Sequence, residues 1–207
     1  MNKPFSAACE RNRAPILAIL KQAFAGSRRV LEIGSGTGQH AVYFGEHLPH
    51  LTWQTSDLPD NHPGILAWLR EAALPNVLPP LWLDAGRQRW SQVNEVYDGV
   101  FTANTCHIMA WHQVGGMFAG IGRVLVPGGV LCIYGPFKEN GRFSGHTDEQ
   151  FDSALKDAAP HMGIRDVEAV LELAAEQGLM LQANHAMPAN NRLLVWQRFG
   201  PSSSGPG

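Results

Sequence analysis

The stretch VLEIGSGTGQHAVYF, Val30 to Phe44, decides the fold of this chain of 207 residues. The apolar run Arg29 to Ile33 predicts a short buried strand, and a loop with three glycines, spaced Gly34-x-Gly36-x-Gly38, follows it. A helix is expected next, from about Gln39 to Leu48. A strand, a glycine loop and a helix in this order are typical of a parallel sheet that binds a ligand at the carboxyl ends of its strands.

Strands and helices alternate along the rest of the chain. Further strands are expected at 51–56, 81–83, 97–103 and 130–134, helices at 13–25, from 63, at 114–125, near 148–156 and from Asp166 to 177, and a final antiparallel pair at 179–185 and 192–198. This order predicts an α/β fold, a Rossmann-like open, mostly parallel seven-stranded sheet with helices on both faces and an antiparallel C-terminal strand. We expect one domain over residues 1–199 and a flexible tail over 200–207.

Composition narrows the possible partners. The net charge is −2, so a nucleic-acid partner is not expected. The three cysteines, Cys9, Cys106 and Cys132, have no close pair spacing, which supports neither a disulfide framework nor a metal site. Neither a signal peptide nor an apolar stretch of membrane-spanning length is found, so a cytoplasmic protein is expected, as a monomer or homodimer.

The glycine loop does not match the phosphate-binding patterns. The dinucleotide fingerprint is G-x-G-x-x-G, and here the third glycine comes one residue early. No Lys-Ser/Thr pair follows the loop, which excludes a P-loop. Glu32, at the end of the strand, would repel a phosphate and suits a cationic head group such as an amine or a sulfonium.

Two further acids follow later strands. Asp57 ends the second strand, 57 − 38 = 19 residues after Gly38, where a carboxylate can accept both hydroxyls of a ribose. Asp84 ends the next strand and could accept from an exocyclic amine such as adenine N6. A cationic amino-acid head, a ribose and an amino-bearing base together indicate S-adenosylmethionine as the cofactor.

At this point the sequence resembles the class I S-adenosylmethionine-dependent methyltransferases, through LEIGSGTG and VLVPGGVL. More narrowly, it is similar to the uncharacterised methyltransferase-like 26 family. That resemblance runs from Cys9 to Arg198 through CERNRAPIL, LEIGSGTGQHAVYF, FTANTCHIMAW, YGPF, GIRD and MPANNR. It implies the fold and the cofactor, and it leaves the acceptor open.

The class pattern implies a set of cofactor-binding positions. Glu32, Gly34, Ser35, Gly36, Gly38 and Asn104 would face the methionine end, Asp57 the ribose, and Leu58, Asp84 and Ala85 the adenine. One departure is informative. Enzymes that methylate exocyclic amines of bases often carry an Asn-Pro-Pro-aromatic motif after the fourth strand, and this chain has Asn104-Thr105-Cys106-His107 there. That departure counts against a nucleic-acid acceptor and favours a small molecule.

Candidates for the acceptor site should lie at the carboxyl ends of the later strands. His107 could act as a general base if the acceptor is a hydroxyl or a protonated amine, and Tyr134 is a second catalytic candidate. Candidates for substrate contact are Asn12, Phe137, Asn190 and Asn191. The hairpin turn that holds the last two is expected at the same edge as the glycine loop, and the polar loop 138–151 could act as a lid.

Two alternatives remain open from the residues alone. A protein could hold S-adenosylmethionine without catalysis, as a regulatory partner. An NAD(P)-dependent oxidoreductase is opposed by the early third glycine and by Glu32.

Overall fold

The computed structural model describes residues 3–200. Its strands are β1 (Arg29–Ile33), β2 (Thr52–Asp57), β3 (Val77–Trp82), β4 (Tyr97–Ala103), β5 (Leu125–Lys138), β6 (Arg165–Asp166), β7 (Leu179–Ala186) and β8 (Asn191–Arg198). Its helices are α1 (Ala7–Ala23), α2 (Gln39–His47), the short 3₁₀ helix η1 (Pro59–Asn61), α3 (His62–Ala72), α4 (Trp111–Val124), α5 (His146–Ala158) and α6 (Val167–Glu176). The predicted tail falls almost wholly on residues 201–207, outside the described residues.

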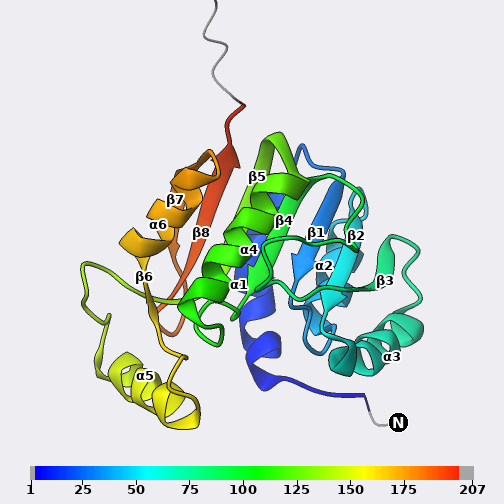
Figure 1. Cartoon of the computed structure of the whole chain (residues 1–207). Coiled ribbons are helices and arrows are strands. Elements are labelled where there is room, and N and C mark those ends of the chain that lie inside the picture. Colours follow the sequence, from blue (N-terminus) through cyan, green and yellow to red (C-terminus); the bar gives the residue numbers. More distant parts are fainter. Residues whose placement is uncertain (1–2, 201–207) are drawn as a thin grey trace, which may run out of the picture.

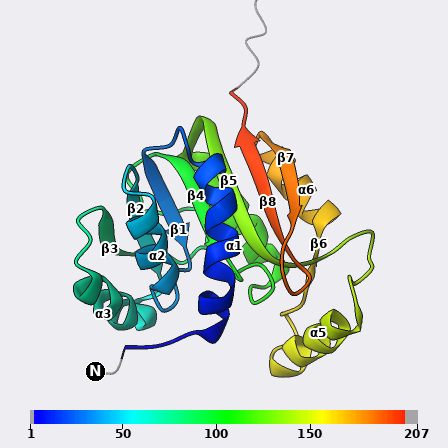
Figure 2. The ribbon, with the colours of Figure 1, turned by 180° about the vertical axis from the view of Figure 1, so that it is seen from behind.

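The sheet has the predicted Rossmann-like form. Within the described residues seven strands follow the order β3-β2-β1-β4-β5-β8-β7, and the two-residue β6 pairs with the end of β5. Helices α4 and α6 cover one face, while α1 and α2 cover the other (Figures 1 and 2). Because β1 pairs with both β2 and β4, the strand order reverses at β1, where an open sheet of this kind places its ligand.

The C-terminal hairpin lies as the sequence predicts. β8 runs antiparallel to both β5 and β7, so β7 is parallel to the first strands. Pro136 pairs with Asn191 at the carboxyl end of β5. The β7–β8 turn is therefore at the same edge of the sheet as the glycine loop.

Three elements extend beyond the predicted limits. β3 includes Pro79 and Pro80, which interrupt the apolar pattern and are tolerated because β3 is an edge strand. β5 continues to Lys138 because β8 and β6 pair with its end. α1 begins at Ala7 rather than at residue 13, because the Ser6 hydroxyl accepts from the Cys9 amide and caps a polar first turn.

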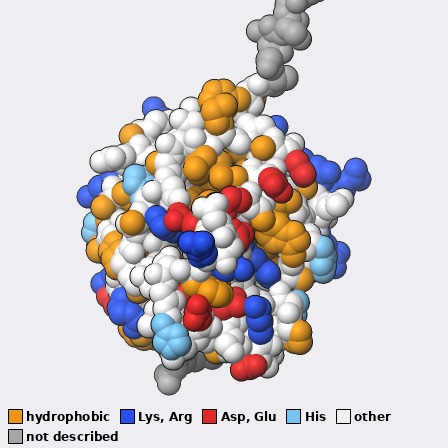
Figure 3. Space-filling model, turned by 90° about the vertical axis from the view of Figure 1, so that its left-hand side faces the viewer, with side chains coloured by type: hydrophobic (Ala, Val, Ile, Leu, Met, Phe, Trp, Pro, Cys, Tyr) orange, Lys and Arg blue, Asp and Glu red, His pale blue; other side chains and the backbone are white. Residues whose placement is uncertain are grey.

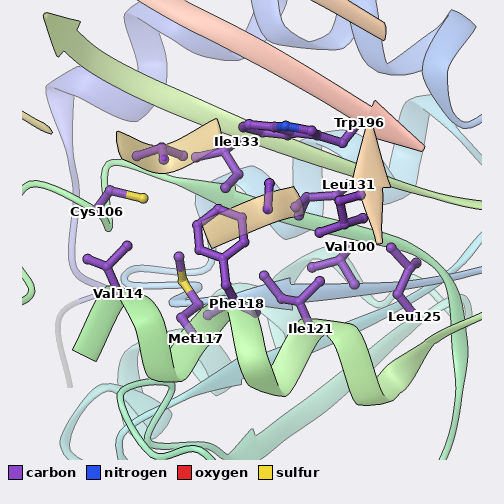
Figure 4. Packing of buried hydrophobic residues seen from close by; sticks show 14 of the residues in the cluster. Val100, Cys106, Val114, Met117, Phe118, Ile121, Leu125, Leu131, Ile133 and Trp196 are labelled. Atoms are coloured by element: carbon purple, nitrogen blue, oxygen red, sulfur yellow. The ribbon is translucent and has the colours of Figure 1, made fainter. Parts of the chain in front are cut away.

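One of the two buried clusters lies between the sheet and α4. Figure 4 shows Phe118 of α4 beneath the indole of Trp196 from β8, with Ile133 and Leu131 of β5 beside it. The rings of Phe118 and Trp196 meet edge to face with centroids 6.2 Å apart. None of the helices within residues 3–200 is long and apolar enough to span a membrane.

Candidate functional site

A cavity of about 1090 Å³ opens at the carboxyl edge of the sheet. Its walls come from the ends of β1, β2, β4 and β5, from the first turns of α1 and α5, and from the β7–β8 turn. Of the sequence-predicted residues, those that line the cavity are Gly34, Ser35, Gly36, Asp57, Leu58, Asp84, Ala85, Asn104, His107, Asn190 and Asn191. The fold therefore brings predicted residues from five separate segments to one place.

The glycine loop is a tight turn fastened to β2. Gly34, Gly36 and Gly38 all have positive φ, at 69°, 55° and 90°, a conformation that favours glycine. A Cβ added to Gly36 would meet no atom within 4 Å, so this glycine leaves open space, whereas one on Gly38 would lie 3.0 Å from the Ile65 backbone. Gly34 and Gly36 line the cavity, and Gly38 packs against α3 instead.

Asp57 organises the part of the cavity beside the glycine loop, which we call the donor side because the sequence predicts the methyl donor there. The part lined by His107, α5 and the β7–β8 turn is called the acceptor side. Its side chain is only 8% exposed. Oδ2 accepts from the Gly36 amide at 2.7 Å, and Oδ1 accepts from the Leu58 amide at 2.7 Å and from the Asn61 side chain at 2.8 Å. Because an ionised carboxylate has about four acceptor positions, one remains for a further donor.

Glu32 lies behind the glycine loop and does not line the cavity. Its Oε2 accepts from the Ser35 hydroxyl at 2.8 Å and from the Trp53 indole at 3.2 Å. Burial raises the pKa of Glu32 to about 7, and the nearby Asp57 adds to the rise. The acid that the sequence places at the end of β1 thus contacts the protein's own loop, and its place in cofactor binding stays a prediction.

The predicted adenine end of the cavity is more exposed than the surroundings of Asp57 and Glu32. Asp84 accepts from the Gly86 amide at 3.2 Å and from Arg87 Nε at 3.1 Å. Leu58 is 48% exposed, which is unusual for a leucine on a cavity wall and leaves a free apolar surface. A planar base has room to lie against this side chain.

The segment after β4 carries His107 into the cavity. Asn104 has φ of 59° and donates its amide to the Tyr134 carbonyl at 2.8 Å, which ties the segment to β5. His107 is 7% exposed, and its ring meets the Phe151 ring edge on with centroids 5.5 Å apart. Burial, together with the positive charge of Arg165, lowers the pKa of His107 to about 4, so the imidazole is neutral at physiological pH.

The other predicted acceptor residues divide into two groups. Asn190 and Asn191 reach the cavity from the hairpin turn. Tyr134 and Phe137 are almost fully buried, and Asn12 accepts from His40 Nε2 at 2.7 Å; none of these three lines the cavity. Their catalytic and substrate-contacting roles stay predictions.

Several wall residues are absent from the sequence predictions. His40 lines the donor side, and Thr147 and Asp148 line the acceptor side beside Phe151. The position of His40, two residues after Gly38, was the one available signal. Thr147 and Asp148 are not named singly by the sequence analysis, but they fall within the stretch 138–151 that it predicts as a lid. From His146 on, that stretch is helix α5 rather than a loop, and the first turn of α5 lines the cavity.

The fold matches solved methyltransferase structures. An O-methyltransferase family protein from Burkholderia thailandensis superimposes with a TM-score of 0.81 at 18% identity, covering 93% of this chain and 58% of that one. The S-adenosylmethionine-dependent methyltransferase SibL gives 0.78 at 20% identity (94% and 56% covered), and the mitomycin 7-O-methyltransferase MmcR gives 0.80 at 15% (93% and 54% covered). The chain spans somewhat over half the length of these proteins.

These identities are low, so the likeness shows a shared fold, that of S-adenosylmethionine-dependent methyltransferases. A family model matches residues 3–198, nearly the whole chain. The chain belongs to the family described as Protein of unknown function (DUF938).

Proposed function

We propose that this protein is an S-adenosylmethionine-dependent methyltransferase that acts on a hydroxyl group of a small molecule. One observation carries the proposal: the glycine loop, Asp57 and the neutral imidazole of His107 border a single cavity at the strand-order reversal. Its volume, about 1090 Å³, is at the upper end for small-molecule sites and leaves room for two ligands.

The residues of the donor side fit the cofactor. Asp57 keeps a free acceptor position for a ribose hydroxyl, and its negative charge is held in place by two backbone amides. Gly36 leaves open the space that a side chain would fill. Leu58 and Asp84 would hold the adenine, and Asn104 the methionine end, while Glu32 would keep Ser35 and the loop in shape.

The residues of the acceptor side would orient the acceptor and take its proton. When bound, S-adenosylmethionine would supply a methyl group on a sulfonium, which is already activated for displacement. His107 is neutral above about pH 4, so its ring can accept a hydrogen bond from the acceptor hydroxyl at neutral pH. Because this low pKa makes it a weak base, it would take the proton only as the hydroxyl oxygen bonds to the methyl group. Phe151, Asn190 and the first turn of α1 would enclose the acceptor and exclude water.

Other observations support the acceptor class. The net charge of −2 and the absence of the Asn-Pro-Pro-aromatic motif favour a small molecule over a nucleic acid. The names of two structural relatives include O-methyl transfer, which is consistent with a hydroxyl acceptor. The narrower resemblance to the methyltransferase-like 26 family belongs to the same proposal.

Calorimetric titration tests the cofactor. We expect binding of S-adenosylmethionine and S-adenosylhomocysteine, and no heat with NAD. Binding of NAD alone would contradict the proposal. Methyl transfer is then followed with isotope-labelled donor and a small-molecule fraction of a cell extract. If the donor binds while no labelled product and no S-adenosylhomocysteine form, the protein is a non-catalytic binder.

A further inference from the structure

The stretch GIRD, Gly163 to Asp166, lies outside the donor site and yet contacts the segment that carries His107. The guanidinium of Arg165 donates from Nε to the Cys106 carbonyl at 3.0 Å, and from Nη2 to the carbonyls of His161, at 2.8 Å, and Met109. It also lies over the Trp111 ring, 5.9 Å from the centroid. One side chain thus fixes the backbone on both sides of His107.

The same stretch holds α5. The Gly163 amide donates to the His107 carbonyl at 2.9 Å, and the next amide, Ile164, donates to Asp152 Oδ1 of α5 at 2.7 Å. Asp152 is 4% exposed. Its neighbour Phe151 is the residue whose ring meets His107. Two consecutive amides therefore connect the candidate base to the wall that faces it.

The stretch is anchored to the sheet, whereas α5 stands apart. β6 pairs with the end of β5, Phe137 with Arg165 and Lys138 with Asp166. Figures 1 and 2 show α5 set off below the sheet. On the side of the molecule shown in Figure 3, acidic and basic side chains lie next to one another rather than forming a field of one sign. The contacts that hold α5 include the hydrogen bonds from the Ile164 amide to Asp152 and from Asn190 to Asp148.

We infer that Gly163–Arg165 is a positioning element that keeps the His107 ring in contact with Phe151 of α5, with Arg165 as its principal side chain. The inference rests on the proposed function, because it takes His107 as the base. Arg165 is a positioning residue: it contacts the carbonyls around His107 and does not line the cavity.

A guanidinium can bind these three carbonyls better than an ammonium can. Its planar fork donates in several directions at once, which matches the divergent carbonyls of Cys106, Met109 and His161. Burial lowers the pKa of His107, and the charge of Arg165 lowers it further. A lysine would keep the charge and lose the fork, so the two contributions can be separated.

The test compares Arg165→Met and Arg165→Lys with wild type by NMR of the full chain, uniformly isotope-labelled. Arg198→Met is the matched control, because Arg198 also donates to a backbone carbonyl, that of Leu125, at the far end of the sheet. Three quantities are measured: the nuclear Overhauser effect between the His107 and Phe151 rings, the protection of the Gly163 amide from exchange, and the pKa of His107.

In Arg165→Met we expect the ring contact to be lost, the Gly163 amide to exchange at least about tenfold faster, and the pKa of His107 to rise. Arg165→Lys should keep the pKa near that of wild type and still lose the ring contact. Arg198→Met should change none of these. A folded Arg165→Met that keeps the ring contact and the Gly163 protection would overturn the inference.

If Arg165→Met does not fold, Asp152→Ala gives a second test. It removes the acceptor of the Ile164 amide and should release Phe151 from His107, so an unchanged ring contact would overturn the inference. Affinity for S-adenosylmethionine should stay within about twofold of wild type in both variants. Failure of the wild type to bind that donor would instead overturn the proposed function, and the catalytic purpose of the element with it.

Discussion

The donor side and the acceptor side of the cavity are built differently. On the donor side, neighbouring strand ends are joined by hydrogen bonds from backbone amides of the glycine loop: the Ser35 amide donates to the Ser56 carbonyl at 3.0 Å, and the Gly36 amide donates to the Asp57 carboxylate at 2.7 Å. On the acceptor side, α5, the hairpin turn and the His107 segment meet mainly through side chains, such as Asn190 to Asp148 at 3.3 Å.

This difference matches two tasks: binding a cofactor of one shape, and binding an acceptor that can differ between related proteins. A loop fixed by backbone hydrogen bonds presents the same surface whatever the surrounding side chains are, which suits a cofactor of one shape. A wall held by side-chain contacts can change with few substitutions, and its local stability is lower. Variants on the two sides should therefore have separable effects on donor affinity and on acceptor chemistry.

The largest effect is expected from His107→Gln. Turnover, measured as S-adenosylhomocysteine release with a small-molecule fraction of a cell extract, should fall at least about 100-fold, while donor affinity stays within about twofold. Because the pKa of His107 is about 4, its protonation should not slow the wild-type enzyme between pH 8 and 6. His112→Gln, at an exposed position on α4, is the control. Equal turnover in His107→Gln and wild type would dismiss His107 as a base.

Glu32→Gln should change how stability depends on pH. The pKa of Glu32 is about 7 in the folded protein and near 4.5 when unfolded, so its stabilising contribution is complete below pH 4.5 and is lost as the pH rises through 7. The fall in unfolding free energy from pH 5 to pH 8 should therefore be smaller in Glu32→Gln, by about 2–3 kcal/mol. Urea unfolding at both pH values measures it, with exposed Glu46→Gln as control. Identical pH profiles would show that Glu32 is not strained by burial.

Asp57→Ala should weaken donor binding by about tenfold or more, because the variant loses the ribose acceptor and the anchor of the Gly36 amide. Calorimetry with S-adenosylmethionine measures the change. Asp60→Ala, three residues away and exposed, is the matched control and should bind like wild type. A dissociation constant for Asp57→Ala equal to that of wild type would remove Asp57 from the donor site.

The smallest effect is expected from Asn190→Ala. Loss of its bond to Asp148 should speed amide exchange in α5 about fivefold, for a link worth about 1 kcal/mol, and leave the glycine loop unchanged. Asn184→Ala, which removes a contact to Glu139 away from α5, is the control. Equal exchange in α5 for both variants would show that the hairpin does not hold this wall.

The same division explains what could be predicted from the sequence. The limits of β1 and β4 were predicted correctly, because each is an apolar run bounded by turn residues. The sequence also predicts the donor-side residues Asp57 and Leu58 at the cavity, since each follows a strand end directly. Patterns of this kind are local, and the ends of parallel strands lie at one edge of the sheet, so the residues that follow them come together there.

The acceptor side could not be read in this way. The position of β6 and the contacts of Arg165 depend on segments that are distant in the sequence, 165 − 137 = 28 residues for β5 and β6 and 59 residues for Arg165 and Cys106. No periodicity marks these pairs. The sequence predicts a helix that begins at Asp166; Asp166 occupies the N-cap position of α6, and its side chain makes no capping hydrogen bond. The direction of the Glu32 side chain could not be predicted either. Its position at a strand end does not reveal that the side chain points toward Trp53 and away from the cavity.

The most direct measurement is a crystal structure of the protein with S-adenosylmethionine bound. We predict the ribose on Asp57, the adenine between Leu58 and Asp84, and the methionine end over Gly34–Gly36, with the methyl group directed toward His107. A donor bound at any other place, or crystals that stay free of it at saturating concentration, would contradict this account.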